Sequence, residues 1–537
     1  MLRLSLSFVS LALLVPLLLH EPSQAQENYR NYQQMTSHLQ QLASEYPGKT
    51  RLESMAVSPG GHDIWRLTVG TGDLDNKPAL AIVAGVDGAH ILGIELALQT
   101  AEALLRDPRH AELIEDQVFY IIPNLNPDAS AQFFSSLVYE RSVNARETDL
   151  DRDGRVSEDP YQDLNGDGLI TMMRVADNTG EWMPHPKDPR VLVKADPLKG
   201  ERSQYRLFSE GLDSDKDGSF NEDPEGGVNL NKNFTYQYPA FDYGAGEFPV
   251  SEAENRALLD WLFDAFNVYA VFTYSPGNNL SNPWTYNRAD AAKRVITGIL
   301  QNDAGVFRSV SELYKEMVPQ QNAPRYELQP GGFLEWGYFH YARYSFGTGG
   351  WWIPSVSDTD HDEVNALAWA DEQGYDIFVE WEEVDHPDFP NQTVEVGGIK
   401  PFAMTTPPYA LVDSLAGIHI EFITDLAAMR PGLVFENVMV EEAGRNLTRV
   451  TMDLYNRGQL PTSTELGTRS QWVRPINVWL DTDGELEMVS GRPHVQIDRL
   501  EGGASQRLTW LVRGRGSVSV RAGTPSAGFA AFTQRIR

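Results

Sequence analysis

The chain has 537 residues, a formal net charge of −31 and no cysteine. A chain of this length is expected to form two or three domains, and its hydrophobic fraction of 41% is enough for a large core. The negative charge argues against nucleic acid and anionic membranes as partners, because phosphate groups are bound by clustered Lys and Arg. The lack of cysteine excludes disulfides, thiolate metal sites and a cysteine nucleophile.

Residues 1–25 have the pattern of a signal peptide. Arg3 supplies the positive start, Leu11 to Leu19 is an apolar run, and Ser23 to Ala25 offers small residues before a cleavage point. The run is shorter than the roughly 20 apolar residues that span a bilayer. We therefore expect cleavage rather than a membrane anchor, no integral membrane segment in the mature chain, and a secreted or periplasmic location.

Strand-like and helix-like segments alternate through most of the chain, which predicts an α/β sheet. The expected strands are Ile64–Val69, Ala79–Ala84, Val118–Ile122 and Val268–Tyr274, and the expected helices are 28–45, Gly93–Leu105, 251–266 and 412–429. Ser251 to Glu254 has the pattern of a capping box. Residues 145–228 interrupt the alternation and are predicted to be a long irregular insertion.

The character of the chain changes after Gly432. Short β-rich segments separated by turn residues begin there, which predicts an all-β sandwich over residues 433–537. The sequence thus predicts a domain over 26–432, with the insertion inside it, followed by a C-terminal β-sandwich domain.

Several ordered motifs resemble the zinc metallocarboxypeptidase family (carboxypeptidase A-like), in a divergent bacterial-type form. They include 84–96, 122–128, 227–234, 273–275, 336–338 and 386–398, and together they span residues 30–430. The resemblance implies a carboxypeptidase-like fold, with a mixed central sheet flanked by helices. It also implies a peptide or protein C-terminus as partner.

The family holds one zinc with two histidines and a glutamate, leaves one position for water, and uses a second glutamate as base. The matching zinc positions here are Asp87, His90 and Ser275. The matching base position is Gly349, with Glu335 or Glu363 as fallback if the alignment is displaced. The resemblance assigns substrate binding to Asn231, Lys232, Tyr338 and Arg146.

Three acidic loops place oxygen-bearing side chains at alternate positions before a glycine, which is the opening half of a calcium loop. Their candidate ligands are Asp149, Asp151, Asp153, Asp163, Asn165, Asp167, Asp213, Asp215 and Asp217. We therefore expect calcium as a cofactor, beside the zinc that the family resemblance implies.

Three functions follow from these observations. The substitutions favour a catalytically impaired or inactive family member that binds a peptide in the inherited cleft. The alternatives are an active metallocarboxypeptidase with a rearranged site, and a calcium-stabilised structural or adhesive protein.

Overall fold

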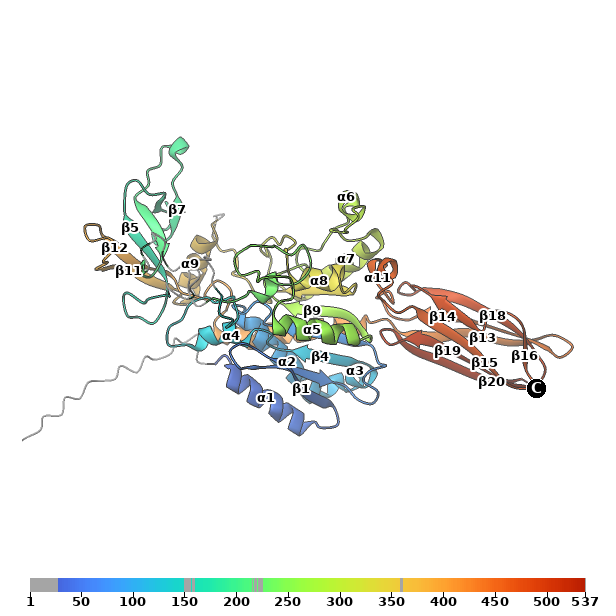
Figure 1. The fold of residues 1–537 in the computed structure, drawn as a ribbon. Coiled ribbons are helices and arrows are strands. Elements are labelled where there is room, and N and C mark those ends of the chain that lie inside the picture. The colour runs from blue at the N-terminus through green and yellow to red at the C-terminus, as the bar shows by residue number, and fades with distance from the viewer. Residues whose placement is uncertain are drawn as a thin grey trace, which may run out of the picture.

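The computed structural model describes residues 28–148, 156, 160–214, 216, 220, 226–357 and 361–536. The expected signal peptide lies outside these residues, as do the candidate calcium ligands Asp149, Asp151, Asp153, Asp215 and Asp217. The described residues form a central α/β domain with a second sheet on one side and an elongated pair of sheets on the other (Figure 1).

The central domain is built on a six-stranded mixed sheet in the order β1-β2-β4-β3-β9-β10. The strand β2 pairs antiparallel with β1 and β4, whereas β4, β3, β9 and β10 run parallel. The strands are β1 (Thr50–Val57), β2 (Asp63–Val69), β3 (Ala79–Ala84), β4 (Val118–Ile122), β9 (Val268–Tyr274) and β10 (Tyr344–Thr348). The predicted α/β fold with a mixed sheet is confirmed.

Helices cover both faces of this sheet, which explains its unbroken apolar strands. Along β3, Leu80 and Ile82 belong to one core, and Ala81 and Val83 belong to the core on the other face. The first core is covered by α1 (Tyr32–Glu45), α2 (Ile91–Arg106), α7 (Gln301–Met317) and α10 (Val412–Ala428), and the second by α5 (Ala253–Asp264) and α8 (Phe333–Phe339). Shorter helices are α3 (Ala111–Asp116), α4 (Pro127–Ser130) and α6 (Arg288–Ala291). No helix within the described residues has both the length and the apolar character needed to cross a membrane.

The prediction of an irregular insertion over 145–228 is wrong, because this segment supplies four strands of a second, antiparallel sheet (Figure 1). We call this sheet, in the order β11-β12-β5-β8-β6-β7, the accessory sheet. Its strands are β5 (Met172–Ala176), β6 (Trp182–Pro184), β7 (Leu192–Lys194), β8 (Tyr205–Ser209), β11 (Phe378–Val384) and β12 (Val394–Ile399). Its small core joins Met173 and Val175 to Val394 and Val396, and α9 (Asp362–Gln373) precedes β11.

The expected capping box does not form. The helix α5 begins at Ala253, and its N-cap is Glu252, whose side chain makes no cap hydrogen bond. The hydroxyl of Ser251 donates to Glu252 Oε1 at 2.6 Å, and Asn144 and Arg146 donate to the two Glu252 oxygens at 2.9 and 2.8 Å. Glu254, the acid of the expected box, instead accepts the Asn144 side-chain amide at 3.1 Å. Both acids therefore hold the segment that carries Asn144 and Arg146.

The C-terminal domain consists of antiparallel strands in two four-stranded sheets, β13-β14-β18-β16 and β17-β15-β19-β20. One core of alternating apolar residues from the two sheets, including Val450, Trp510, Val478 and Val520, lies in this domain. The strands are β13 (Leu433–Gly444), β14 (Leu447–Asn456), β15 (Ile476–Gly484), β16 (Glu487–Ser490), β17 (His494–Ile497), β18 (Ser505–Arg513), β19 (Gly516–Thr524) and β20 (Gly528–Ile536), and α11 (Glu465–Ser470) follows β14. The division of the chain at residue 432 stays a prediction.

A buried carboxylate joins the C-terminal strands to the central domain. Asp303, near the start of α7, is fully buried and its oxygens accept the Arg499 guanidinium at 2.7 Å and the Glu465 N–H at 2.9 and 3.0 Å. The hydroxyls of Tyr338 and Tyr344 donate to the same carboxylate at 2.8 and 3.3 Å. One side chain therefore connects α7, α8, β10, α11 and the loop before β18.

We predict that Asp303→Ala strongly destabilises this junction, because it leaves the Arg499 guanidinium buried without its partner. Breaking a buried ion pair on one side costs about 3–5 kcal/mol. In calorimetry, we expect the intact protein to unfold in one transition and the variant to unfold in two. The control is Glu501→Ala, which removes the exposed partner of Arg499, 2.8 Å away. Equal melting curves for the two variants would contradict the role given to Asp303.

Candidate functional site

The carboxyl ends of three parallel strands bring the four predicted zinc and base positions into one region. Asp87 and His90 follow β3, Ser275 follows β9, and Gly349 follows β10. The strands pair in register, with Ala84 beside Tyr274 and Tyr274 beside Thr348. In open α/β sheets, ligands bind at this edge. The ends of the strands thus form the candidate site that the motif order predicts.

A hydrogen bond between His90 and Gly349 lies at the centre of this site. The His90 Nε2 is 3.0 Å from the Gly349 carbonyl oxygen. Because a carbonyl can only accept, Nε2 must carry the proton and point it at Gly349. Burial lowers the pKa of His90 to about 4, and the carbonyls of Gly349 and Tyr274 oppose this shift only in part. The imidazole is therefore neutral, with Nε2 already used as a donor.

The other two zinc positions offer weak ligands. Ser275 is buried and presents a neutral hydroxyl, and its N–H donates to the Thr348 carbonyl at 3.1 Å. Asp87 accepts the Ala89 N–H at 3.3 Å. Burial raises the pKa of Asp87, the Ala89 N–H opposes this rise, and the nearby Glu140 carboxylate adds to it.

This donor set does not fit a catalytic zinc, which needs three ligands with free lone pairs around one open position. His90 directs its Nε2 proton at a backbone carbonyl, and its Nδ1 is buried against Gly93, where a built Cβ would lie 2.6 Å from it. Ser275 is not an anion. Within the described parts of the chain, no group of three or more His, Asp and Glu side chains is arranged to hold a metal ion.

The base position has room but no functional group. A Cβ built on Gly349 would lie 3.4 Å from the Trp351 carbonyl oxygen and 3.8 Å from His90 Nε2, which are ordinary contacts. A Cβ at this position is therefore tolerated beside His90. The packing does not require glycine here, and glycine provides no group that could accept a proton.

The carboxylate of Glu335, the fallback base, is hydrogen-bonded within the protein. It is fully buried in α8, and it accepts hydrogen bonds from the Tyr326 hydroxyl and the Gln329 N–H. Burial raises the pKa of Glu335 to about 7, although these two donors oppose the shift. Gln329 in turn donates to the Asn231 carbonyl at 3.0 Å. Glu335 thus supports the segment that carries Asn231.

Of the predicted substrate-binding residues, Lys232 is the one with an available charge. Its Nζ donates to the Tyr243 carbonyl at 3.3 Å, and it forms no ion pair with a carboxylate among the residues that the structure describes. Its backbone is fixed by Gly331, where φ is +73° and a Cβ would come within 2.1 Å of the Lys232 carbonyl oxygen. The neighbouring Asn231 uses its side-chain oxygen to accept the Phe333 N–H at 3.0 Å.

Tyr338 and Arg146 are occupied within the protein. Tyr338 is fully buried, and its hydroxyl donates to Asp303 and accepts the Leu300 N–H at 3.0 Å. The expected covering of a substrate by Tyr338 does not agree with this burial. Arg146 forms ion pairs with Glu252 at 2.8 Å and Glu247 at 3.0 Å.

The acidic loop at 163–168 is shaped by its own backbone. Both oxygens of Asp163 accept backbone N–H groups, from Gly166 at 2.6 Å and Gly168 at 2.8 Å. Asp167 accepts the Leu169 N–H at 2.8 Å, and Asn165 accepts the Asp167 N–H at 3.1 Å. These bonds account for the alternating acids and glycines without a cation. Calcium at the acidic loops stays a prediction.

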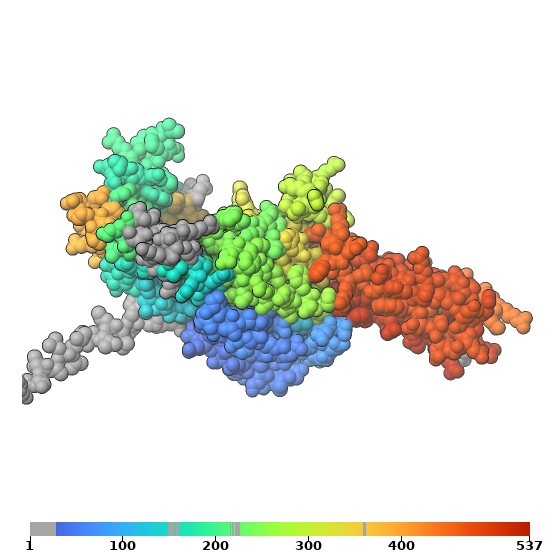
Figure 2. Space-filling view, viewed as in Figure 1, coloured from blue at the N-terminus to red at the C-terminus, as the bar shows by residue number. Residues whose placement is uncertain are grey.

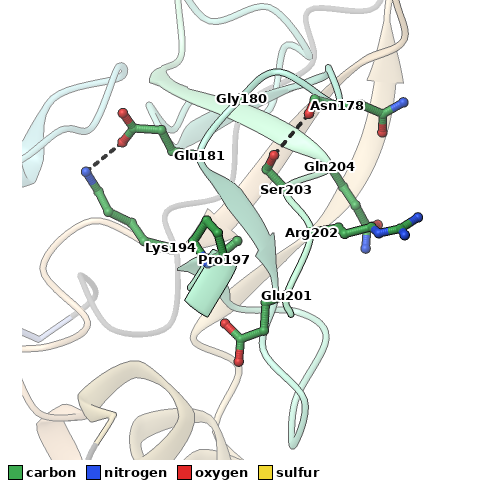
Figure 3. A pocket seen from close by; sticks show the side chains of 10 residues that line it. Asn178, Gly180, Glu181, Lys194, Pro197, Glu201, Arg202, Ser203 and Gln204 are labelled. Carbon is green, nitrogen blue, oxygen red and sulfur yellow. Dashed lines mark hydrogen bonds and ion pairs between the residues drawn. The ribbon is translucent and has the colours of Figure 1, made fainter. Parts of the chain in front are cut away.

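The accessory sheet contributes two hollows that the sequence did not indicate. One, of about 640 Å³, lies where this sheet meets the segment after η2 (Ala131–Phe134) and the segment after β12, and it is lined by aromatic and charged residues. The other, of about 830 Å³, is polar and lies near β6 and β7, where Lys194 pairs with Glu181 at 2.7 Å and Ser203 donates to the Asn178 carbonyl (Figure 3).

Comparisons with known proteins match two parts of the chain. The family described as "Zinc carboxypeptidase" matches residues 35–168, and the family described as "Domain of unknown function (DUF8731)" matches residues 432–534. The chain is 31% identical to carboxypeptidase D of Homo sapiens over 134 residues, which are 23% of this chain and 10% of that protein. It is 30% identical to carboxypeptidase M of Mus musculus over 107 residues, which are 19% of this chain and 24% of that protein. The matches thus span a quarter or less of these relatives.

Among solved structures, the carboxypeptidase A of Helicoverpa armigera aligns with a TM-score of 0.44 and 13% identity, covering 75% of this chain and 74% of that one. The matched family segment 35–168 includes Asp87 and His90, whereas Lys232, Ser275 and Gly349 lie beyond it.

We predict that His90 makes the protein less stable in acid. An unfolded histidine binds a proton near its ordinary pKa of 6.5, whereas folded His90 binds one near pH 4. Its contribution is therefore complete above pH 6.5 and is lost as the pH falls toward 4, at about 1.4 kcal/mol per pH unit. NMR titration is expected to find the His90 ring protonating near pH 4, and His90→Gln to reduce the acid-side slope of the unfolding free energy. A ring that titrates near 6.5 would exclude the buried neutral form.

We predict that Asp163→Ala destabilises the fold by about 1–3 kcal/mol, because two backbone N–H groups lose a charged acceptor. Thermal melts should show this loss with or without a chelator. The same melts check calcium: the expected outcome is a lower Tm with the chelator that added calcium restores. If the chelator has no effect, the acidic loops work through their hydrogen bonds alone.

Proposed function

We propose, from the membership of residues 35–168 in the zinc carboxypeptidase family, that the protein binds the C-terminal end of a peptide or protein without hydrolysing it. The observation that carries this proposal is the hydrogen bond from His90 to Gly349. It uses Nε2 as a donor while Nδ1 is buried against Gly93, at the position where the family needs a metal ligand. It also lies beside a glycine where the family needs a base.

Hydrolysis of an amide needs an activated water and a group that takes its proton. Ser275 gives a poor ligand for the first task, and Gly349 has no side chain for the second. General-base catalysis alone contributes typically about 10²–10⁴-fold, so a site lacking both parts is not expected to turn over peptides at a useful rate.

Binding of a peptide needs neither a metal nor a base, and Lys232 supplies a positive charge for it. An ammonium group without a carboxylate partner can pair with the terminal carboxylate of a peptide, and such charge-assisted hydrogen bonds are stronger than neutral ones. Lysine lacks the two-pronged geometry of arginine, so this contact recognises charge more than shape. The expected signal peptide would place this binding outside the cytoplasm.

The main alternative is an active enzyme whose base has moved to Glu335. Its pKa of about 7 suits a general base. Its buried position and its bonds to Tyr326 and Gln329 favour a supporting role for the Asn231 segment instead.

We predict that the purified protein holds well under one zinc per chain and releases no C-terminal residues from a mixed peptide panel with added zinc. Elemental analysis and mass spectrometry of the panel check this. One tightly bound zinc that is lost on His90→Ala would contradict it. Chelator-sensitive release that Glu335→Gln abolishes would show that the base has moved.

A gain-of-function variant serves as the matched control. Asp87→His, His90→Glu, Ser275→His and Gly349→Glu together restore the family's ligands and base at positions that already lie in one region. We expect zinc binding only when the three ligand changes are combined, and hydrolysis only with the fourth, because these groups act as a unit. The contacts around Gly349 tolerate the Cβ that this last change adds.

We predict that Lys232→Ala weakens the binding of peptides with a free C-terminal carboxylate by about tenfold or more, through loss of one charge-assisted hydrogen bond. The same peptides with an amidated C-terminus should bind the intact protein and the variant equally. Calorimetry measures both, and Lys315→Ala, an exposed lysine on α7, is the control. No difference between free and amidated peptides would end the proposal.

A further inference from the structure

The cavity of about 640 Å³ against the accessory sheet has the size and lining of a binding pocket. Its walls are aromatic and come from separate parts of the chain, namely Tyr139, Tyr161, Trp182, Phe208, Phe378 and Trp381. Most of these residues are half-buried, so their rings are held by the fold and still reach the cavity. The walls belong largely to the insertion and to β11, which build the accessory sheet (Figure 1).

Two of these rings already form cation–π contacts with arginine side chains. The Arg174 guanidinium lies 4.3 Å from the centroid of the Trp381 ring, and the Arg190 guanidinium lies 5.8 Å from that of Phe378. Tyr139 and Tyr161 pack against each other at 4.5 Å. Aromatic faces attract cations, and this attraction grows when water is excluded. The surroundings of the cavity therefore already accommodate cations on aromatic rings.

The basic residues that line the cavity are neutralised by acids. Arg190 pairs with Asp188 and Asp371, each at 2.7 Å, and Lys400 pairs with Asp376 at 2.7 Å. These three acids offset the positive charge of the lining. A negatively charged ligand would have to compete with all of them.

The acids that line the cavity, Glu140 and Glu363, lack such partners. Glu140 accepts the Phe402 N–H at 2.7 Å, and neither glutamate forms an ion pair with a lysine or arginine in the described part of the chain. Burial raises the pKa of Glu363, with Asp362 adding to the rise and His361 opposing it. A cation in the cavity would favour the ionised form of Glu363.

We propose that this cavity binds a positively charged side chain, a lysine or an arginine, of a peptide that the protein binds. The inference rests on the proposed peptide-binding function and names its ligand class. The geometry that carries it is the aromatic wall together with Glu140 and Glu363 in the same lining.

The test compares a set of peptides in which a single lysine is moved along an otherwise neutral sequence, with norleucine in its place as the uncharged control. Calorimetry on the full chain is expected to find at least one position where lysine binds about tenfold more tightly than norleucine, which corresponds to about 1.4 kcal/mol. Glu140→Gln combined with Glu363→Gln should remove this ratio and leave the affinity for the norleucine peptide unchanged. Glu201→Gln, in the polar hollow of the same insertion, makes the same charge change elsewhere and should preserve the ratio.

Each other outcome overturns the inference. If peptides bind and depend on Lys232, but lysine and norleucine bind equally at all positions, the cavity is not a cation site and the proposed function survives. If no peptide binds, the proposed function and the inference fail together. Binding of neutral oligosaccharides, with the lysine ratio absent, would assign the aromatic walls to sugar instead. Circular dichroism of the double variant verifies that it is folded.

Discussion

The hydrogen bond from His90 to Gly349 constrains the whole candidate site. It ties the loop after β3 to the end of β10, across the strand β9 that lies between them. In a buried setting an unpaired donor or acceptor costs about 1–3 kcal/mol, so this bond is maintained and the ring stays neutral. With Nε2 committed to Gly349, the ammonium group of Lys232 is the charge on which the proposed recognition of a carboxylate depends.

The fold of the central domain could be predicted because its strands are buried on both faces. The strands β3, β4 and β9 read as unbroken apolar runs, and their predicted bounds agree with the observed ones. The accessory sheet could not be predicted in the same way. Met172 on β5 pairs with Gly397 on β12, more than 200 residues later in the chain, and an antiparallel sheet with a small core needs few apolar residues. Short polar strands with distant partners resemble loops in the sequence.

The sequence predicts where the candidate site lies, but not which of its side chains are free to bind a ligand. The order of the motifs was enough to bring Asp87, His90, Ser275 and Gly349 together, because the ends of parallel strands meet at one edge. Whether a side chain is free depends on packing between distant segments. Tyr338 is buried because its hydroxyl binds Asp303, which in turn binds Arg499 of the C-terminal domain. No local pattern around Tyr338 contains that information.

Glu140 lines the cavity, and it also bears on the substituted zinc positions. Its carboxylate adds to the rise in the pKa of Asp87, because a like charge disfavours ionisation. In a metal site, a divalent cation would compensate for both acids. Here a neutral histidine and a serine stand in place of ligands, so that compensation must come from elsewhere. The cavity offers aromatic faces and the carboxylates of Glu140 and Glu363, which form no ion pair with a lysine or arginine in the described part of the chain, whereas its basic residues are paired with acids. In the proposed complex, a positive group on the ligand would supply the charge next to Glu140 that a metal would otherwise supply.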